Sequence, residues 1–358
     1  MLRVDRRLLI QFDWQLFGLA GCLIGAGLVT VSTLVPRLGA RQLVALGIAT
    51  VVAMVVLAVD YRTLARWACW GYGLGLVTLL GVLLVGRSAM GARRWIAVGP
   101  ISLQPSELFK LAFIGTLAVY LAARDSSRPG WDRVLVPLAL TLPAVALIVK
   151  QPDLGTALML LPVAVALIVV GGARWRHLGM LAGCGLAVLP VFWFLLRDYQ
   201  RERILVYIDP SRDPLGSAWN VIQAKITIGS GQLGGKGLFG GTQSRLAFLP
   251  ERHTDFVFAA YAESWGFLGA MALLIVYALL VLRGFEVAAT ARDTLGTLLA
   301  TGATVLLAAQ ALVNLGMVTG LLPVVGIPLP FVSYGGSALL TAVAAVALIA
   351  NVRMRRFV

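Results

Sequence analysis

Residues 255–282 read DFVFAAYAESWGFLGAMALLIVYALLVL, and no charged side chain follows Glu263 within this stretch. An apolar run of this length crosses a hydrocarbon core of about 30 Å as a helix. The whole chain is apolar like this stretch: its 358 residues are 59% hydrophobic and 13% charged, with a mean hydropathy of +0.89. These values exclude a soluble globular protein and indicate an integral membrane protein.

Apolar runs long enough to cross a membrane recur along nearly the whole sequence. They predict one all-α membrane domain over residues 1–358, with about ten transmembrane helices. The predicted spans are 14–35, 42–60, 64–86, 105–123, 133–150, 154–172, 176–196, 255–282, 295–321 and 331–350. The residues between the seventh and eighth spans, 197–254, form one large loop.

The distribution of basic residues predicts the orientation in the membrane. Arginine is concentrated in the segments on the same side as the N-terminus, which the positive-inside rule assigns to the cytoplasm. Both termini are then cytoplasmic, and the loop 197–254 is extracytoplasmic. The net charge of +14 is spread over these segments instead of forming one stripe, so it does not indicate nucleic-acid binding. All the lysines, Lys110, Lys150, Lys225 and Lys236, fall on the outer side. An anionic, extracytoplasmic ligand is a reasonable inference.

The large loop contains a glycine-rich segment, VIQAKITIGSGQLGGKGLFGG, at residues 221–241. Its GSGQLG matches a dinucleotide-binding pattern, but no strand-turn-helix unit surrounds it, so we reject that interpretation. Two interpretations stay open. Glycine N–H groups flanked by basic residues can cradle an anion such as phosphate, or the segment is a flexible loop with solvated charges. The basic residues concerned are Lys225, Lys236, Arg245 and Arg252.

Ionisable residues also occur at the outer ends of the predicted spans. Glu107 and Lys110 have the spacing of a local ion pair on a helix. Asp255, if a helix begins there, shares one stripe with Glu263, which would lie deeper in the membrane. A carboxylate at such depth usually faces the protein interior or a watery cavity. Asp255 as an N-cap or as a catalytic group, and Glu263 as the partner of a buried cation from another span, all remain open.

Two further features of the outer side bear on the site. Glu251, His253 and Asp255 are a conceivable metal-binding trio, although adjacent polar residues in a loop are more often solvated. Prolines 323, 328 and 330 with Gly326 exclude regular helix before the last span. Irregular backbone at membrane depth must be buried in protein or line a cavity.

Four stretches of the sequence carry a resemblance to a known family: GARRWIAVGPISLQPSELFK (91–110), QPDLGT (151–156), GSGQLGGKGLFGGTQSRLAFLPERHTDFVFAAYAE (229–263) and NLGMVTGLLPVVGIPLPFVSYGGSALL (314–340). Together they resemble the SEDS (shape, elongation, division and sporulation) family. The short N-terminal tail is more similar to the elongation member than to the division member. The resemblance implies a glycosyltransferase that polymerises lipid II into peptidoglycan strands during cell elongation and cell-shape maintenance, in the bacterial cytoplasmic membrane.

The resemblance also implies roles for individual residues. The essential acidic residue of the family's HTDF motif falls on Asp255, the expected general base of an inverting reaction. The first acidic residue of a following pair falls on Glu263, also expected to be catalytic, while Ser264 replaces the second. Expected substrate-binding residues are Trp95, Glu107, Lys110, Lys225, Lys236, Arg245, Arg252, His253, Ser333 and Tyr334. His253 is expected to position Asp255. A divalent cation, Mg²⁺ or Mn²⁺, is the one cofactor expected, if there is any.

Expected partners, by the same resemblance, are lipid II, a class B penicillin-binding protein that supplies transpeptidase activity, and other membrane proteins of the elongation complex. Two other functions stay open. A flippase that moves lipid II across the membrane would use the same number of spans and a central cavity, although the two halves of the chain show no convincing duplication. A scaffold that recruits cell-wall enzymes would leave the outer ionisable residues unexplained.

Overall fold

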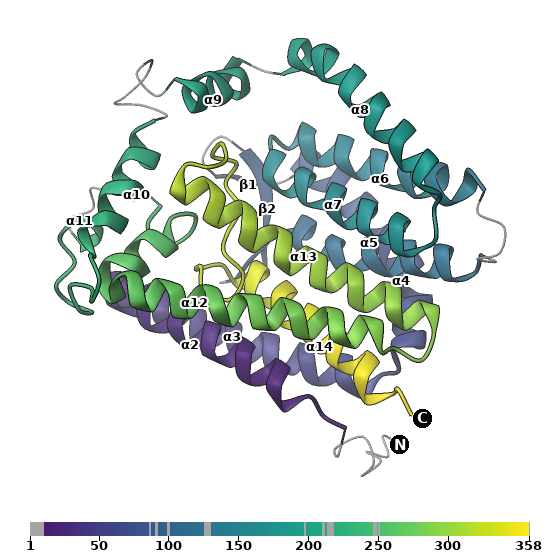
Figure 1. Cartoon of the computed structure of the whole chain (residues 1–358), viewed down its shortest axis with the longest axis horizontal. Coiled ribbons are helices and arrows are strands. Elements are labelled where there is room, and N and C mark those ends of the chain that lie inside the picture. The colour runs from purple at the N-terminus through teal and green to yellow at the C-terminus, as the bar shows by residue number, and fades with distance from the viewer. Residues whose placement is uncertain are drawn as a thin grey trace.

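The computed structural model describes residues 11–85, 87–89, 92–98, 101–124, 130–196, 198–209, 212, 218–245, 249 and 251–357. A helix lies within a few residues of every predicted span, and the prediction of an all-α membrane bundle is confirmed (Figure 1). The helices are α2 (Trp14–Leu34), α3 (Pro36–Ala58), α4 (Tyr61–Val85), α5 (Pro105–Ala122), α6 (Asp132–Lys150), α7 (Leu154–Val170), α8 (Trp175–Leu195), α12 (Val257–Ala289), α13 (Thr294–Thr319) and α14 (Gly336–Met354).

Among the described residues, eight of these helices are long and apolar enough to cross a membrane. The apolar helix α7 is shorter, with 17 residues. Three helices form the centre of the bundle: the most apolar windows of α5 and α13 are 67% buried and that of α14 is 83% buried, against 17% for α3 and α4. The outer helices expose large apolar side chains such as Trp70 and Leu74. Hydrocarbon is the solvent that suits such a surface, so the chain is a multi-pass membrane protein.

The connection between α4 and α5 is a small antiparallel sheet that the sequence interpretation missed. Its strands are β1 (Arg87–Ala89), β2 (Ala92–Val98) and β3 (Ile101–Leu103), in the order β1-β2-β3. Trp95 lies on β2 opposite Arg87. The sheet lies at the same end of the bundle as Asp255, which we call the outer end. The outer end comprises residues 87–89, 92–98, 101–103, 151–153, 218–245, 249, 251–256 and 320–335.

The predicted loop 197–254 contains helices of its own: α9 (Asp198–Ile208), α10 (Trp219–Ser230) and the single turn α11 (Thr242–Arg245). α10 packs on α12 and α13. In Figure 1, α8 runs outside α6 and α7, and α9 stands apart from the other helices. The Tyr207 hydroxyl of α9 donates a hydrogen bond to the carbonyl of Leu321, 2.8 Å away, so the large loop reaches the irregular segment before α14.

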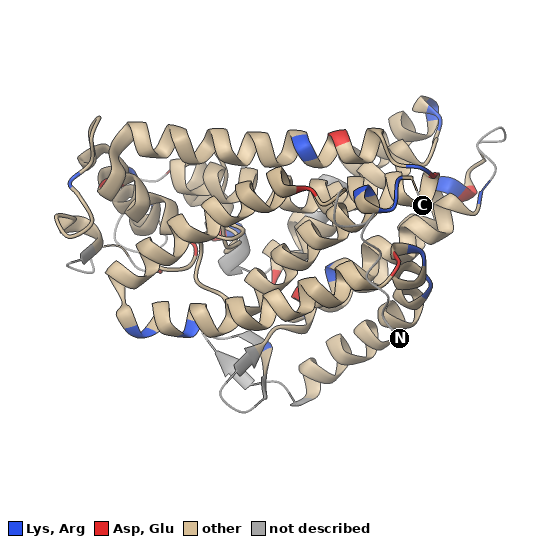
Figure 2. Cartoon of the chain, turned by 90° about the horizontal axis from the view of Figure 1, so that it is seen from below, with Lys and Arg blue, Asp and Glu red and all other residues tan. Residues whose placement is uncertain are grey.

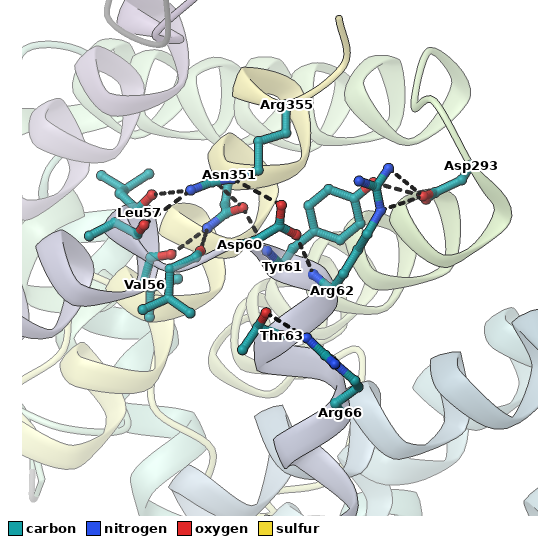
Figure 3. Close-up of polar contacts among 12 residues, drawn as sticks. Val56, Leu57, Asp60, Tyr61, Arg62, Thr63, Arg66, Asp293, Asn351 and Arg355 are labelled. Carbon is teal, nitrogen blue, oxygen red and sulfur yellow. Dashed lines mark hydrogen bonds and ion pairs between the residues drawn. The ribbon is translucent and has the colours of Figure 1, made fainter. Parts of the chain in front are cut away.

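Charged residues gather near the ends of the helices (Figure 2). At the inner end, opposite to Asp255, a polar network joins the turn between α3 and α4 to α13 and α14 (Figure 3). Asp293 caps α13 through the Gly296 N–H at 2.7 Å, and it accepts bonds from the Tyr61 hydroxyl at 2.9 Å and Arg62 at 3.0 Å. Burial alone would raise the pKa of Asp293, but these three donors lower it overall.

A second part of the inner-end network is centred on Asn351 of α14. Its side-chain oxygen accepts bonds from the Tyr61 N–H at 3.2 Å and from Arg355 at 2.7 Å, and its amide nitrogen donates to the Val59 carbonyl at 2.7 Å. Nearby, buried Asp13 contacts Arg283 of α12 at 3.1 Å and Arg353 of α14 at 3.2 Å. The inner ends of α2, α3, α4, α12, α13 and α14 are therefore tied to one another.

Candidate active site

Asp255 lies just outside the helix that follows it. α12 begins at Val257, and its N-cap residue is Phe256. The expected helical stripe through Asp255, Ala259 and Glu263 is therefore wrong at Asp255, and the interpretation of Asp255 as the cap of this helix is also wrong. Asp255 is half-buried, in a turn between the large loop and α12.

The backbone around Asp255 is held by groups from α13 and from the segment between α13 and α14. The Asn314 side-chain amide of α13 donates to the Asp255 carbonyl at 2.8 Å and to the Ile327 carbonyl at 2.7 Å. The Ser333 hydroxyl donates to the Thr254 carbonyl at 2.6 Å, and the Tyr334 N–H donates to the carbonyl of His253 at 2.8 Å. All these bonds reach backbone atoms, so they orient the Asp255 side chain without using its carboxylate.

The segment 320–335 is irregular, as its prolines predicted. At Gly326 the backbone has φ = +72°, and a Cβ there would lie 3.4 Å from a carboxylate oxygen of Asp255. The Gln42 side chain from α3 fixes the far end of the segment, by donating to the Ser333 carbonyl at 3.0 Å and accepting from the Gly335 N–H at 3.3 Å. The segment thus forms one wall beside Asp255.

Ser333, Tyr334 and His253 are therefore brought together with Asp255, as expected. The rings of His253 and Tyr334 lie 5.9 Å apart between centroids. Burial lowers the pKa of His253 below its ordinary value, so this imidazole is neutral at neutral pH. The Ser333 hydroxyl is buried, and it also accepts a hydrogen bond from the Leu329 N–H at 2.8 Å.

Glu263 is fully buried on α12, and its partners come from the large loop instead of another span. Its carboxylate accepts bonds from the Lys236 ammonium at 2.9 Å and the Ser230 hydroxyl at 3.2 Å. It also accepts the backbone N–H groups of Thr242, Gln243 and Ser244 at 3.0, 3.1 and 2.9 Å. Glu263 does have a cationic partner, but Lys236 is partly exposed and belongs to the large loop, so the interpretation of a buried cation from another span is wrong.

The glycine-rich segment is docked into a break in α12. At Gly266 the backbone leaves the helical conformation, with φ = 66° and ψ = −168°. The Phe267 and Leu268 N–H groups donate to the carbonyls of Gln232 and Leu233, at 2.7 and 3.2 Å. In return, the Lys236 and Gly237 N–H groups donate to the carbonyls of Glu263 and Ser264, at 2.9 and 3.0 Å. At the break, hydrogen bonds between α12 and the loop replace hydrogen bonds within the helix. The backbone groups therefore stay paired, as a membrane environment requires.

This docking answers the question that the sequence left open about the glycines. The loop N–H groups at 236 and 237 bind α12 carbonyls, so they are not available to an external phosphate. Nor is the segment a free loop. Its glycines allow close contact between backbones, since a Cβ on Gly235 would lie 2.3 Å from the Ser264 carbonyl oxygen.

Gly235 and Gly237 give a matched test of this docking, because their φ angles are +79° and +80°. In both positions alanine costs about 1–2 kcal/mol for the left-handed backbone. At Gly237 a Cβ meets nothing within 4 Å, whereas at Gly235 it meets α12 backbone. We expect Gly235→Ala to lower the free energy of unfolding by roughly 1–3 kcal/mol more than Gly237→Ala does. Thermal unfolding in detergent measures the difference. Equal losses would contradict the docked arrangement.

Glu107 and Lys110 form the predicted local ion pair, with 2.7 Å between charged atoms, and both side chains are buried on α5. Gln104, the residue before α5, makes a series of polar contacts at the outer end. The Gln104 side chain donates to Asp153 at 2.9 Å, and the Gln104 N–H donates to the Ser337 hydroxyl of α14 at 3.0 Å. These contacts join α5 and α7 to the start of α14, which follows the wall beside Asp255.

The remaining predicted substrate-binding residues occupy the outer end in different ways. Lys225 of α10 is exposed beside Gly320, and Trp95 is on the sheet. Arg252, three residues before Asp255, donates to the Ser244 carbonyl, and burial lowers its pKa. Lys236 is bound to Glu263. The side chain of Arg245 lies outside the described residues.

The suggested metal trio is not assembled. Among the described residues, no group of three histidine, cysteine or acidic side chains is placed to hold a metal ion. Glu251 instead accepts a bond from the Thr254 hydroxyl at 2.8 Å. In the described part of the chain, protein side chains therefore form no site that would hold Mg²⁺ or Mn²⁺ with three such ligands of their own.

Several important residues were missed from the sequence. Asn314 and Gln42 hold the wall beside Asp255, and Gln104 joins α5 to α7 by its bond to Asp153. Asn314 lies within a predicted span that has no charged residue, and its amide is a signal in itself, since polar residues inside membrane helices usually serve a specific contact. Gln42 begins a predicted span and carried no comparable signal.

Comparisons with known proteins agree with this architecture. The family of cell cycle proteins that contains FtsW, RodA and SpoVE matches residues 17–357. The peptidoglycan glycosyltransferase MrdB of Escherichia coli is 39% identical over 317 residues, which cover 88% of this chain and 85% of that protein. Stage V sporulation protein E of Bacillus subtilis is 38% identical over 318 residues, covering 87% and 86%.

Solved structures show the same fold. A chain of a peptidoglycan synthase complex, described as coordinating polymerization and crosslinking, is 38% identical, with a TM-score of 0.84 over 97% of this chain and 98% of that one. The rod shape determining protein RodA of Thermus thermophilus is 35% identical, with a TM-score of 0.74 over 97% and 98%. The match in sequence and in fold extends through both Asp255 and the docked loop, and this chain belongs to the FtsW–RodA–SpoVE, or SEDS, family.

Proposed function

We propose that this protein is a peptidoglycan glycosyltransferase that polymerises lipid II into glycan strands during cell elongation, with Asp255 as the general base. One observation carries the proposal. Asp255 lies in a turn whose backbone is fixed at three successive carbonyls, those of His253, Thr254 and Asp255, by Tyr334, Ser333 and Asn314, while its carboxylate faces the wall at Gly326. Relatives such as MrdB of Escherichia coli are named peptidoglycan glycosyltransferases, which supports the proposal.

The chemistry requires few protein groups. The 4-hydroxyl of the acceptor sugar attacks the anomeric carbon of the donor, and the bond from that carbon to the undecaprenyl pyrophosphate breaks with inversion. Asp255 accepts the hydroxyl proton, and a positioned base of this kind typically contributes 10² to 10⁴ in rate. Because no water is activated, a second carboxylate of the hydrolase type is not needed.

The departing pyrophosphate needs positive charge at the outer end. Arg252 precedes Asp255 by three residues, and the exposed Lys225 lies on α10 beside Gly320. Preorganised cations and N–H groups stabilise charge that develops in a transition state. A Mg²⁺ or Mn²⁺ ion remains a proposal, and it would have to arrive with the pyrophosphate because the described side chains form no site for it.

The surroundings of the site complete the proposal. The site faces the extracytoplasmic side of the bacterial cytoplasmic membrane, and both termini are cytoplasmic. The partner is a class B penicillin-binding protein, together with other membrane proteins of the elongation complex. The related chain in the peptidoglycan synthase complex supports such a partner.

Purified protein with its partner, given lipid II in detergent, tests the proposal. We expect glycan polymer, resolved by gel electrophoresis. Reconstituted vesicles that move labelled lipid II between leaflets and form no polymer would instead support the flippase alternative. The tied inner end of the bundle favours the polymerase, since transport needs that end to open.

A further inference from the structure

Glu263 resembles a catalytic carboxylate in the sequence, but its surroundings are those of an internal counter-ion. Its side chain is 0% exposed. One oxygen accepts from Lys236, Ser230, Thr242 and Gln243, and the other accepts from Ser244 at 2.9 Å. A general base must reach the proton that it removes. A carboxylate enclosed by the protein's own donors does not reach a substrate hydroxyl.

The donors around Glu263 have the form of an anion-binding nest. Three successive backbone N–H groups, at residues 242–244, converge with an ammonium group, which is the arrangement that binds phosphate in other proteins. Here the anion is the protein's own carboxylate. The anion cradle is therefore formed by the turn 242–244, directly after the glycine-rich segment, together with Lys236 of that segment, and α12 supplies the anion.

The nest connects Glu263 to the neighbourhood of Asp255 through one residue. The Ser244 N–H donates to Glu263, while the Ser244 carbonyl accepts from the Arg252 guanidinium. Arg252 stays a cation although burial lowers its pKa. Ser244 thus holds a fixed position between a carboxylate buried in α12 and a cation three residues from the proposed base.

From these contacts we infer that Glu263 is a positioning residue: through the turn 242–244 and Ser244 it fixes the Arg252 guanidinium, which belongs to the turn that carries Asp255, for the departing pyrophosphate. The inference rests on the proposed function and gives one of its residues a different role. Glu263→Gln retains the size of the side chain but directs an NH₂ group at N–H donors. We expect it to release the turn and to leave Arg252 misplaced.

Amide hydrogen exchange of full-length protein tests the positioning without any substrate. In Glu263→Gln we expect the amides of residues 242–244 to exchange at least 10-fold faster than in wild type. Glu286→Gln is the matched control, because Glu286 is an exposed glutamate on the same helix and pairs with Arg283 away from the loop. Unchanged exchange in Glu263→Gln would overturn the inference.

Kinetics separates positioning from catalysis. We expect Glu263→Gln to lower kcat roughly 100-fold, the scale of a small misplacement of a catalytic group, while the midpoints of the pH profile stay at their wild-type values. We also expect Arg252→Gln and the double variant Glu263→Gln/Arg252→Gln to have equal kcat, since both remove the same placed guanidinium. Loss of the acidic limb in Glu263→Gln, or multiplication of the two single losses, would overturn the inference.

Two outcomes keep this test distinct from that of the proposed function. If wild-type protein makes no glycan polymer, the proposed function fails, and the exchange experiment still decides whether Glu263 holds the turn. If Glu263→Gln does not fold, Lys236→Gln removes the ammonium and leaves the three N–H bonds. It should then raise exchange at 242–244 by a smaller factor, and unchanged exchange there overturns the inference.

Discussion

Asp255→Asn should lower the rate of lipid II polymerisation by roughly 10² to 10⁴, the contribution of a positioned general base. Asparagine keeps the shape of the side chain and removes its ability to accept the proton of the attacking hydroxyl. Folding should survive, because Asn314, Ser333 and Tyr334 hold carbonyl groups of residues 253–255 and not the carboxylate. A polymerisation assay and thermal unfolding of the same preparation measure both expectations.

The control for this variant is an acidic residue at the same end with no proposed chemistry. Glu251→Gln changes the charge four residues away, on a side chain that bonds to Thr254, and it should leave most of the activity. If Asp255→Asn unfolds at the wild-type temperature and still makes polymer at the wild-type rate, Asp255 is not the base.

Asn314→Leu should cause the largest loss of stability among single changes at the site. The Asn314 amide is the donor to two carbonyl oxygens, those of Asp255 and Ile327, and its residue is 0% exposed. A buried polar group left without its partner costs about 1–3 kcal/mol, so two carbonyls together cost roughly 2–6 kcal/mol. Activity should fall as well, because the turn that carries Asp255 loses its attachment to α13.

Gln310→Leu is the matched control for Asn314→Leu. Gln310 is also a buried amide on α13, one turn earlier, and no bond from it to the site is found among the described residues. Thermal unfolding in detergent should show a much smaller shift for Gln310→Leu. Similar shifts would mean that Asn314 contributes only as a polar residue in an apolar helix.

The arrangement of spans could be predicted because hydropathy acts locally. Each run of apolar residues is long enough to cross the membrane whatever the other spans do, and the helices lie within a few residues of the predictions. The last span begins at Gly336 instead of 331, because residues 331–335 belong to the irregular segment. Its prolines had already predicted irregular backbone, so only the boundary was misjudged.

The partners of polar residues could not be predicted, because they depend on contacts between distant segments. The spacing of Glu107 and Lys110 was enough to predict their pairing, since both lie on one helix turn. Glu263 instead pairs with Lys236 and the turn 242–244, which no local pattern reveals. The same limit applies to Gly266, whose conformation makes sense only beside the docked loop. The sheet at 87–103 was missed because strands of three to seven residues carry little periodicity.

The polar network at the inner end bears on which step must precede polymerisation in cell-wall synthesis. Asp13, Asp293, Asn351 and their partners tie together six helices, and a passage through the inner end would require these contacts to separate together. Because the inner end is closed, substrates reach the protein from its outer end. With the orientation proposed above, lipid-linked sugars are delivered already facing outward, by a separate translocation step, before this protein joins them.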